Sequence, residues 1–133
     1  MTSVLNVDSI AAKDGTSPVE LTKQSAAKAW VNFNGTGTIA ARDSLNISGL
    51  ADNGTGDYTV TFSNALSNAN YSSTMSCGQD STGNSGLRAA NGLSSTTRTT
   101  SVIRVGTATV SSTSNRTSID DNTISLSIHG DLA

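Results

Sequence analysis

The sequence predicts an all-β protein, an antiparallel β-sandwich of about seven or eight strands. Residues 57–62 alternate strictly between polar and apolar side chains, as a half-buried strand requires. Similar short alternating segments recur along the chain without recurrent helical patterns. Turn signals such as Asn34-Gly35 and Asn53-Gly54 separate them. Many short strands with both hairpin and longer connections are typical of a sandwich.

The core that this chain can build is thin. Its 133 residues fit one domain, but only 35% are hydrophobic and 4% aromatic, whereas serine and threonine account for 41 residues. Apolar burial contributes about 25 cal/mol per Å², so a core short of large side chains leaves little surplus over conformational entropy. We therefore expect association with other chains to add stability.

Charge and hydropathy exclude several classes of function. The formal net charge is -2 and the eight lysines and arginines are scattered, so we expect no binding to nucleic acid. No apolar run approaches the roughly 20 residues that span a bilayer, so we expect no membrane insertion. The start Met1-Thr2-Ser3 lacks a signal-peptide pattern, and the single Cys77 cannot form an internal disulfide. Both observations favour cytoplasmic synthesis without general export.

The sequence divides into an arm and linker over residues 1–29 and a sandwich domain over residues 30–133. Residues 3–10 alternate as a β-competent arm with too little apolar surface to fold alone, so we expect them to dock on another protein. Residues 13–18 form a turn or linker cluster. Two predictions then compete, a helix capped by Ser17 and Glu20 and a strand in which Val19 and Leu21 alternate with polar residues. We favour an extended segment followed by a short helix over residues 24–28.

Three strands are expected in the first half of the sandwich, over residues 30–34, 38–47 and 57–62, antiparallel in succession across the two Asn-Gly turns. Trp30 lies on the face opposite to Val31 and Phe33, which makes it a candidate subunit-contact residue. In the middle strand Ile39, Ala41, Leu45 and Ile47 are in phase. Asp43 falls on the same parity, which predicts a bulge or an Arg42-Asp43 surface pair.

The second half predicts strands over residues 71–77, 101–105, 107–110 and 123–129. Residues 79–91 and 111–121 are rich in Gly, Ser, Asn and Thr and read as exposed polar loops, where binding functions are often carried. From these loops we select six candidate contact residues: Asp80, Asn84, Arg88, Asn91, Asn115 and Arg116.

The chemical inventory predicts no enzyme, no cofactor and no metal site. Cys77 is best explained as a small buried hydrophobe, because no neighbouring histidine or basic residue would lower its pKa. His129 lies on the polar face of the last strand and reads as a solvated histidine. Four carboxylates could bind calcium in principle but lack the ligand spacing of a known loop. They are Asp52, Asp57, Asp120 and Asp121.

Several segments of the first half carry a family resemblance. Residues 28–38 read KAWVNFNGTGT, residues 42–48 read RDSLNIS and residues 52–60 read DNGTGDYTV. Together they closely resemble the β module of tail-fibre-like virion proteins of marine bacteriophages, including cyanophages and pelagiphages. Residues 3–10, SVLNVDSI, are similar to the N-terminal segment of such proteins. The second half of the chain matches only in composition.

The resemblance implies a virion structural protein, a short trimeric tail fibre or tail appendage attached by its N-terminal arm. The implied partners are two further copies of the chain, another virion protein of the tail, the portal-proximal region or the capsid, and a glycan of the host surface. The thin core and the incomplete arm are consistent with a trimer that is attached to another protein. The anchoring residues would be Val4, Leu5, Val7 and Ile10, and the subunit-contact residues Leu21 and Trp30.

Two alternatives remain open at the level of sequence. The first is a capsid decoration or head-fibre protein, whose arm would add a strand to the surface sheet of the major capsid protein. The second is a glycan-active enzyme or a host-derived binding module. The absence of a convincing carboxylate pair in the sequence argues against the enzyme.

Overall fold

The computed structural model describes residues 26–78, 87–92, 98–112 and 115–133, and these form nine strands. The strands are β1 (Ala29–Asn34), β2 (Ala40–Leu45), β3 (Ile47–Gly54), β4 (Asp57–Phe62), β5 (Ser72–Gly78), β6 (Leu87–Gly92), β7 (Val102–Ser112), β8 (Asn115–Ser118) and β9 (Thr123–His129). Nowhere in the described part of the chain is there a helix capable of crossing a membrane.

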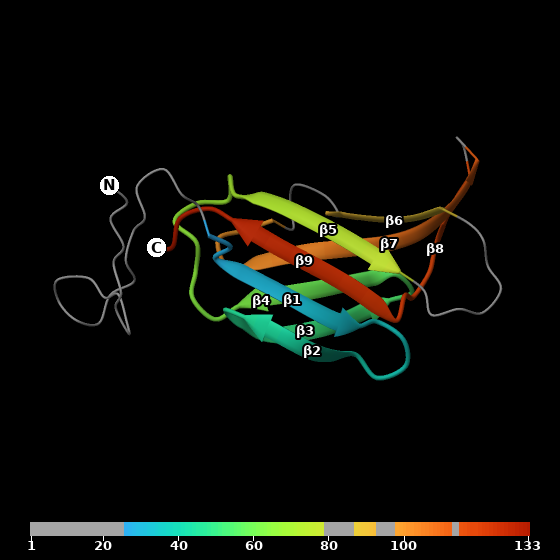
Figure 1. Ribbon diagram of the computed structural model, residues 1–133, viewed down its shortest axis with the longest axis horizontal. Coiled ribbons are helices and arrows are strands. Elements are labelled where there is room, and N and C mark those ends of the chain that lie inside the picture. The colour runs from blue at the N-terminus through green and yellow to red at the C-terminus, as the bar shows by residue number, and fades with distance from the viewer. Residues whose placement is uncertain (1–25, 79–86, 93–97, 113–114) are drawn as a thin grey trace, which may run out of the picture.

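Two antiparallel sheets lie face to face (Figure 1). The first sheet has four strands in the order β2-β1-β9-β5. The second has five, in the order β3-β4-β7-β6, with β8 also paired to β7. The predicted fold class, an all-β antiparallel sandwich, is confirmed, with nine strands where seven or eight were expected.

The core lies between the sheets and follows the alternation in the sequence. Every second residue of β1, β4 and β9 is buried, and the registers align these residues, with Val31 opposite Leu126 and Val60 opposite Ile103. Phe33 packs edge to face against the ring of Tyr58, which belongs to the opposite sheet. The ring centroids are 5.4 Å apart. Each fully buried large apolar side chain contributes about 1.5–3 kcal/mol, so the few aromatic residues carry much of the stability.

The described chain enters the sandwich directly at β1. The backbone N–H of Lys28 donates to the carbonyl of Ile128 at 2.8 Å, so the chain is tied to β9 one residue before β1 begins. Residues 26–28 are not helical, so the short helix predicted over 24–28 is wrong for its described part. The rest of the predicted arm and linker lies outside the described residues.

Residues 38–47, predicted as a single strand, contribute to two strands in different sheets. β2 ends at Leu45, Asn46 adopts a positive φ of 58°, and β3 begins at Ile47 in the second sheet. The expectation that three successive strands pair side by side is therefore also wrong. The apolar phase of Ile39 and Ala41 continues through Leu45 and Ile47, so alternation alone gives no sign of the crossing.

Asn46 holds this crossing in place through its side-chain amide. Its Nδ2 donates to the carbonyls of Lys28 and Asn64, each at 3.1 Å, and its Oδ1 accepts from the backbone N–H of Asn64 at 2.7 Å. Asparagine tolerates the left-handed conformation better than other residues with a Cβ. One side chain thus joins the start of β1, the crossing between the sheets and the segment that follows β4.

The predicted bulge in β2 is confirmed. Asn32 pairs with Asp43 and Phe33 pairs with Ala41, which leaves Arg42 as the extra residue. The Arg42 guanidinium donates to the carbonyl of Phe33 at 3.1 Å and also to the carbonyl of Asn122. β2 is an edge strand, and its side chains are exposed along its whole length.

The two Asn-Gly pairs mark turns, but neither forms the turn alone. Residues 35–39 join β1 to β2, and the positive φ, 63°, belongs to Gly37. Residues 55–56 join β3 to β4, and Gly56 has a φ of 66°. A Cβ at Gly56 would lie 2.4 Å from the carbonyl oxygen of Thr107, so glycine is required there for conformation and for space.

β7 is one continuous strand, although the sequence predicts two, and residues 87–91 and 115–118 form strands where loops were expected. β4 pairs with β7 only as far as Asp57 and Gly106. Beyond this point β8 pairs with the same side of β7, starting with Ser118 opposite Ala108. Strands β6, β7 and β8 thus extend past the rest of the sandwich (Figure 1).

The sandwich has two ends with different contents. The terminal end contains the entry into β1 and the last residues of the chain, where Leu66 forms a bridge with Leu132. The distal end contains the turns at residues 35–39 and 55–56 and the segment 119–122. There the N–H of Gly35 donates to the carbonyl of Asp121 at 3.0 Å.

Candidate functional site

Seven of the twelve site residues predicted from sequence lie outside the described residues. They are Val4, Leu5, Val7, Ile10, Leu21, Asp80 and Asn84. The other five lie in two places. Trp30 is in β1 on the outer face of the first sheet, and Arg88, Asn91, Asn115 and Arg116 are in β6 and β8 near the distal end.

Asn91 and Arg116 are brought together on the outer face of the second sheet. The Arg116 Nη2 donates to the Asn91 Oδ1 at 2.8 Å, across β7, which separates the two strands. Ala108, which shares this face of β7, has no exposed surface. Asn115 is the first residue of β8 and pairs with Ser112. Asn91 and Arg116 therefore form a polar cross-strand pair at the surface rather than isolated loop side chains.

The same face carries an ion pair between Asp57 and Arg104. The Arg104 Nε donates to the Asp57 Oδ1 at 2.6 Å, and its Nη2 contacts the second carboxylate oxygen. Asn53 adds a longer contact to Asp57 at 3.4 Å. The Arg104 guanidinium lowers the pKa of Asp57, against the opposing effect of partial burial.

Arg88 does not fit its predicted role as a surface contact. Its side chain turns inward from β6, and its Nη1 lies 3.1 Å from the Oδ1 of Asp121. Only 10% of the Arg88 side chain and none of the Asp121 side chain is exposed. The composition of residues 79–91 suggested a loop, but β6 pairs with β7 and directs Arg88 between the sheets, where a buried carboxylate matches its charge.

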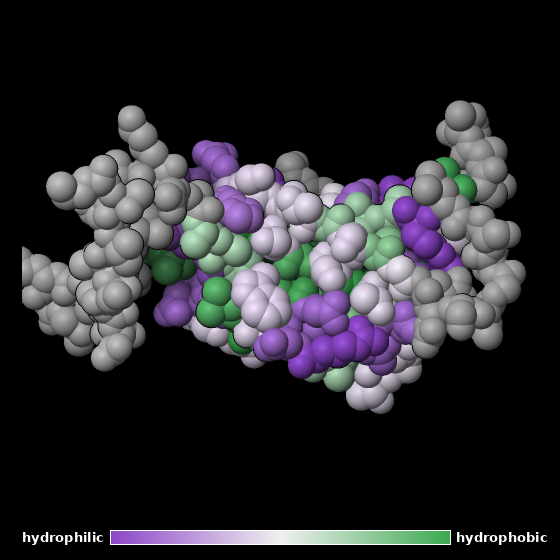
Figure 2. All heavy atoms as spheres, viewed as in Figure 1, coloured by the Kyte–Doolittle hydropathy of each residue, from purple (hydrophilic) through white to green (hydrophobic). Residues whose placement is uncertain are grey.

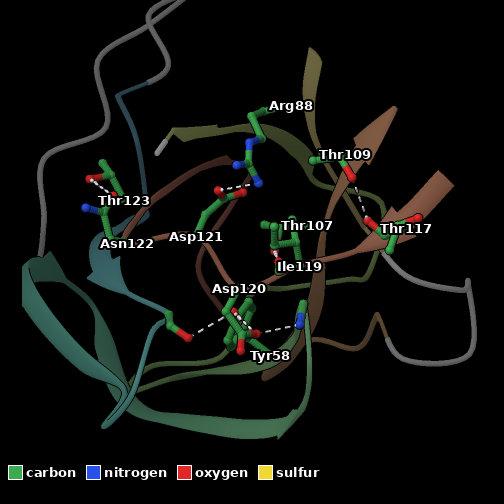
Figure 3. A network of polar contacts seen from close by, with 12 residues as sticks. Tyr58, Arg88, Thr107, Thr109, Thr117, Ile119, Asp120, Asp121, Asn122 and Thr123 are labelled. Atoms are coloured by element: carbon green, nitrogen blue, oxygen red, sulfur yellow. Dashed lines mark hydrogen bonds and ion pairs between the residues drawn. The ribbon is translucent and has the colours of Figure 1, made fainter. Parts of the chain in front are cut away.

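A network of polar contacts surrounds this ion pair at the distal end (Figure 3). The Tyr58 hydroxyl donates to the Asp120 Oδ1 at 2.8 Å, and the same oxygen accepts from the N–H of Gly56 at 2.7 Å. The Thr107 hydroxyl donates to the carbonyl of Ile119 at 2.6 Å. Burial and the neighbouring Asp120 raise the pKa of Tyr58. The network fixes the segment that leads from β8 into β9.

Cys77 lies beside this network, partly buried and packed against the core. Burial and the neighbouring Asp121 raise the pKa of the Cys77 thiol to about 11, against the opposing effect of Arg88. A thiol with this pKa is almost entirely protonated at neutral pH and is a poor nucleophile. The described residues include no group of three or more His, Cys, Asp or Glu side chains that could hold a metal ion. Asp57, Asp120 and Asp121 instead have arginine, tyrosine or backbone partners.

The outer face of the first sheet is built differently, in two rows that cross all four strands. One row consists of Leu45, Trp30, Ser127 and Thr74. The other row consists of Asp43, Asn32, Ser125 and Ser76. Leu45, at 48% exposure, is the one exposed large hydrophobic residue of the described chain, and it lies directly opposite Trp30.

Between these rows lies a depression of about 350 Å³, called the outer hollow below. Trp30, Asn32, Thr74, Ser76, Ser125 and Ser127 line it, and Val31, Met75 and Leu126 form its floor. Figure 2 shows atoms of hydrophobic residues, in green, at depth between the paler residues of this face. Of these residues, sequence reasoning selected only Trp30. The available signal was the row of serines on the outward positions of residues 123–129.

No protein-family model matches the chain, and comparisons with curated proteins and with solved structures give no significant match.

Proposed function

We propose that the protein is a bacteriophage virion structural protein, a short trimeric tail fibre or tail appendage that is attached to the particle by its N-terminal arm. The resemblance of residues 3–10, 28–38, 42–48 and 52–60 to tail-fibre-like proteins of marine phages supports this role. The protein acts through attachment and presentation, without catalysis. It is located on the virion after synthesis in the host cytoplasm.

One observation carries the proposal: the described chain enters the sandwich at one end, and the strands that extend furthest lie at the other. Lys28 is bonded to Ile128 at the terminal end, whereas β6, β7 and β8 pass beyond the pair Asp57–Gly106 at the distal end. An arm over residues 1–29 would hold the sandwich by its terminal end. The distal end, with Asn91 and Arg116 at its surface, would then face away from the particle toward the host.

The trimeric state is proposed from the thin core and from the arm. The core cluster is drawn from thirteen buried hydrophobic residues, four of them aromatic. A marginal monomer gains stability when copies associate, because association removes further apolar surface from water. In this proposal Leu21 contributes to the contact between the three arms.

The attachment role is tested with full-length variants in phage particles. We expect that replacing Val4, Leu5, Val7 and Ile10 together by serine prevents incorporation into the virion while the sandwich keeps its thermal transition. The matched control replaces the polar neighbours Asn6 and Asp8 by serine, and this variant should be incorporated normally. Normal incorporation of the first variant would remove the basis for an anchoring arm.

Imaging of labelled particles separates the proposed role from its alternative. A tail appendage appears at one vertex in a few copies, whereas a capsid decoration protein appears over many sites of the shell. Sedimentation of the purified protein measures the oligomeric state, and a monomer at all concentrations would exclude the trimer.

A further inference from the structure

We propose that the outer hollow is a binding site for a neutral hexopyranose ring of a glycan. The site lies on the side of the first sheet, apart from the distal strands to which the proposed function assigns host contact. It does not depend on where the protein is attached to a particle. Three features of the hollow support such a ligand: its shape, its hydrogen-bonding groups and its single indole ring.

The shape of the hollow results from side-chain size. Four of the nine residues around the hollow are serine or threonine, namely Thr74, Ser76, Ser125 and Ser127, and these small side chains leave a depression above the strands at Val31, Leu126 and Met75. The side chains of Val31 and Leu126 themselves are buried in the core. Its volume of about 350 Å³ falls at the lower end of the range for small-molecule pockets, which suits one or two sugar rings. Trp30, the largest lining side chain, forms one wall.

The lining groups match a ligand that both donates and accepts hydrogen bonds. Asn32 is held in a fixed orientation, because its Nδ2 donates to the Ser125 Oγ at 2.8 Å and its Oδ1 accepts from the Arg42 Nη1 at 3.3 Å. The Ser125 hydroxyl accepts from Asn32 and so can still donate its own proton toward a ligand. Ser127 lies 3.3 Å from the Nε2 of His129, which orients a second hydroxyl.

Trp30 supplies the apolar surface that a sugar ring requires. An indole offers a large, rigid face with little loss of side-chain entropy on binding, and one face of a pyranose carries mainly C–H groups that pack against such a ring. Aromatic stacking together with a small number of fixed polar groups is a general pattern of ligand sites. The candidate contact residues at the distal end, Asn91, Asn115 and Arg116, include no aromatic side chain.

The absence of charge among the nine lining residues selects a neutral sugar over an anionic one. The hydroxyl groups of the lining also argue against a second copy of this chain as the occupant, although the sequence predicts Trp30 as a subunit-contact residue. An apolar subunit surface would bury the hydroxyls of Thr74 and Ser76 without partners, at a cost of about 1–3 kcal/mol each. A sugar ring supplies partners for them.

The test uses the full-length protein and the emission of its tryptophan. Trp30 is the only tryptophan in the chain, so its fluorescence reports on the hollow alone. The probes are four neutral hexasaccharides: maltohexaose, cellohexaose, laminarihexaose and chitohexaose. We expect at least one of them to shift or quench the emission in a saturable manner, with a dissociation constant on the order of 1 mM or below.

Variants then connect the signal to the hollow, with binding measured by calorimetry. Trp30→Ala should abolish binding, and Thr74→Val, which replaces a hydroxyl by a methyl group, should weaken it at least about tenfold. The matched control is Thr61→Val, the same loss of a hydroxyl on a strand of the second sheet, and it should bind like the wild type. Urea unfolding of each variant verifies that the sandwich is intact.

Three results would overturn the proposal. They are a complete lack of response to all four sugars, equal weakening by Thr61→Val and Thr74→Val, and an emission change that follows protein concentration in the absence of sugar. The last result would identify a second copy as the occupant. None of them affects the arm variants, so failure of this site and failure of the attachment role are distinguishable.

Discussion

At the terminal end of the sandwich, apolar side chains and a neutral amide close the space between the sheets, whereas ionised groups close it at the distal end. Leu66 and Tyr71 are buried at the first, and Asn46 links three segments with its amide. At the second, Asp121 is 1% exposed and is paired with Arg88.

The difference shows what each end contributes to the fold. Apolar closure adds stability roughly in proportion to the area removed from water. A buried ion pair adds little net stability, because desolvation offsets attraction, but it strongly penalises any arrangement in which one partner is missing. The distal end therefore fixes one path for the segment from β8 to β9.

The largest effect is expected from breaking the distal ion pair. Asp121→Ala should lower the free energy of unfolding by about 3–5 kcal/mol, because it leaves the Arg88 guanidinium between the sheets without its carboxylate. The double variant Arg88→Met/Asp121→Leu should recover most of this loss, since it replaces two buried charges by apolar groups. Urea unfolding measures both. If Asp121→Ala lowers the free energy of unfolding by less than about 1 kcal/mol, the distal end does not depend on this ion pair.

A smaller effect is expected at the terminal end from Asn46. Asn46→Ala should lower the free energy of unfolding by about 2–3 kcal/mol. It removes the amide hydrogen bonds, and alanine has no polar group to offset the strain of a Cβ at a φ of 58°. Asn46→Gly serves as the control, since glycine tolerates this φ and loses only the hydrogen bonds. It should be the more stable of the two variants, and equal stability would show that the conformation of Asn46 is unstrained.

The smallest effect is expected from the surface pair Asp57–Arg104, and it depends on pH. The folded-state pKa of Asp57 is lowered, so the carboxylate contributes stability above its ordinary pKa of 3.8, and this is lost as the pH falls through the lowered value. Asp57→Asn should therefore lower Tm by a few degrees at pH 7 and by less near pH 2. Arg104→Met should remove the same pH dependence. A Tm difference that grows on acidification would show that folding raises the pKa of Asp57 instead of lowering it.

The sequence was most informative where alternation is strong and the neighbours lie close in the chain. The strands at residues 57–62, 71–77 and 123–129 were predicted within a residue or two, since every second side chain is more buried than its neighbours. The parity of Asp43 predicted a bulge or an Arg42-Asp43 surface pair, and the structure has the bulge. In each case a local pattern reflects burial directly.

Long-range pairing was not visible in the sequence. β6 contains small residues and an arginine, and its strand character depends on β7, so its composition resembles a loop. Arg88 was assigned to the surface because a charged residue is usually solvated, and its partner Asp121 comes from a distant segment. The outer hollow was missed, apart from Trp30, because it combines residues of β1, β5 and β9 that only the sheet order brings together.

The bulge in β2 also bears on aggregation. A regular edge strand offers its unpaired N–H and C=O groups to any other strand and can template sheet growth from molecule to molecule. In β2 the extra residue Arg42 interrupts this pattern, and a charged Asp43 follows it on the exposed edge. Many copies can therefore be concentrated in a small volume without joining through this edge, and deleting Arg42 to restore a regular edge would make the protein prone to insoluble assembly.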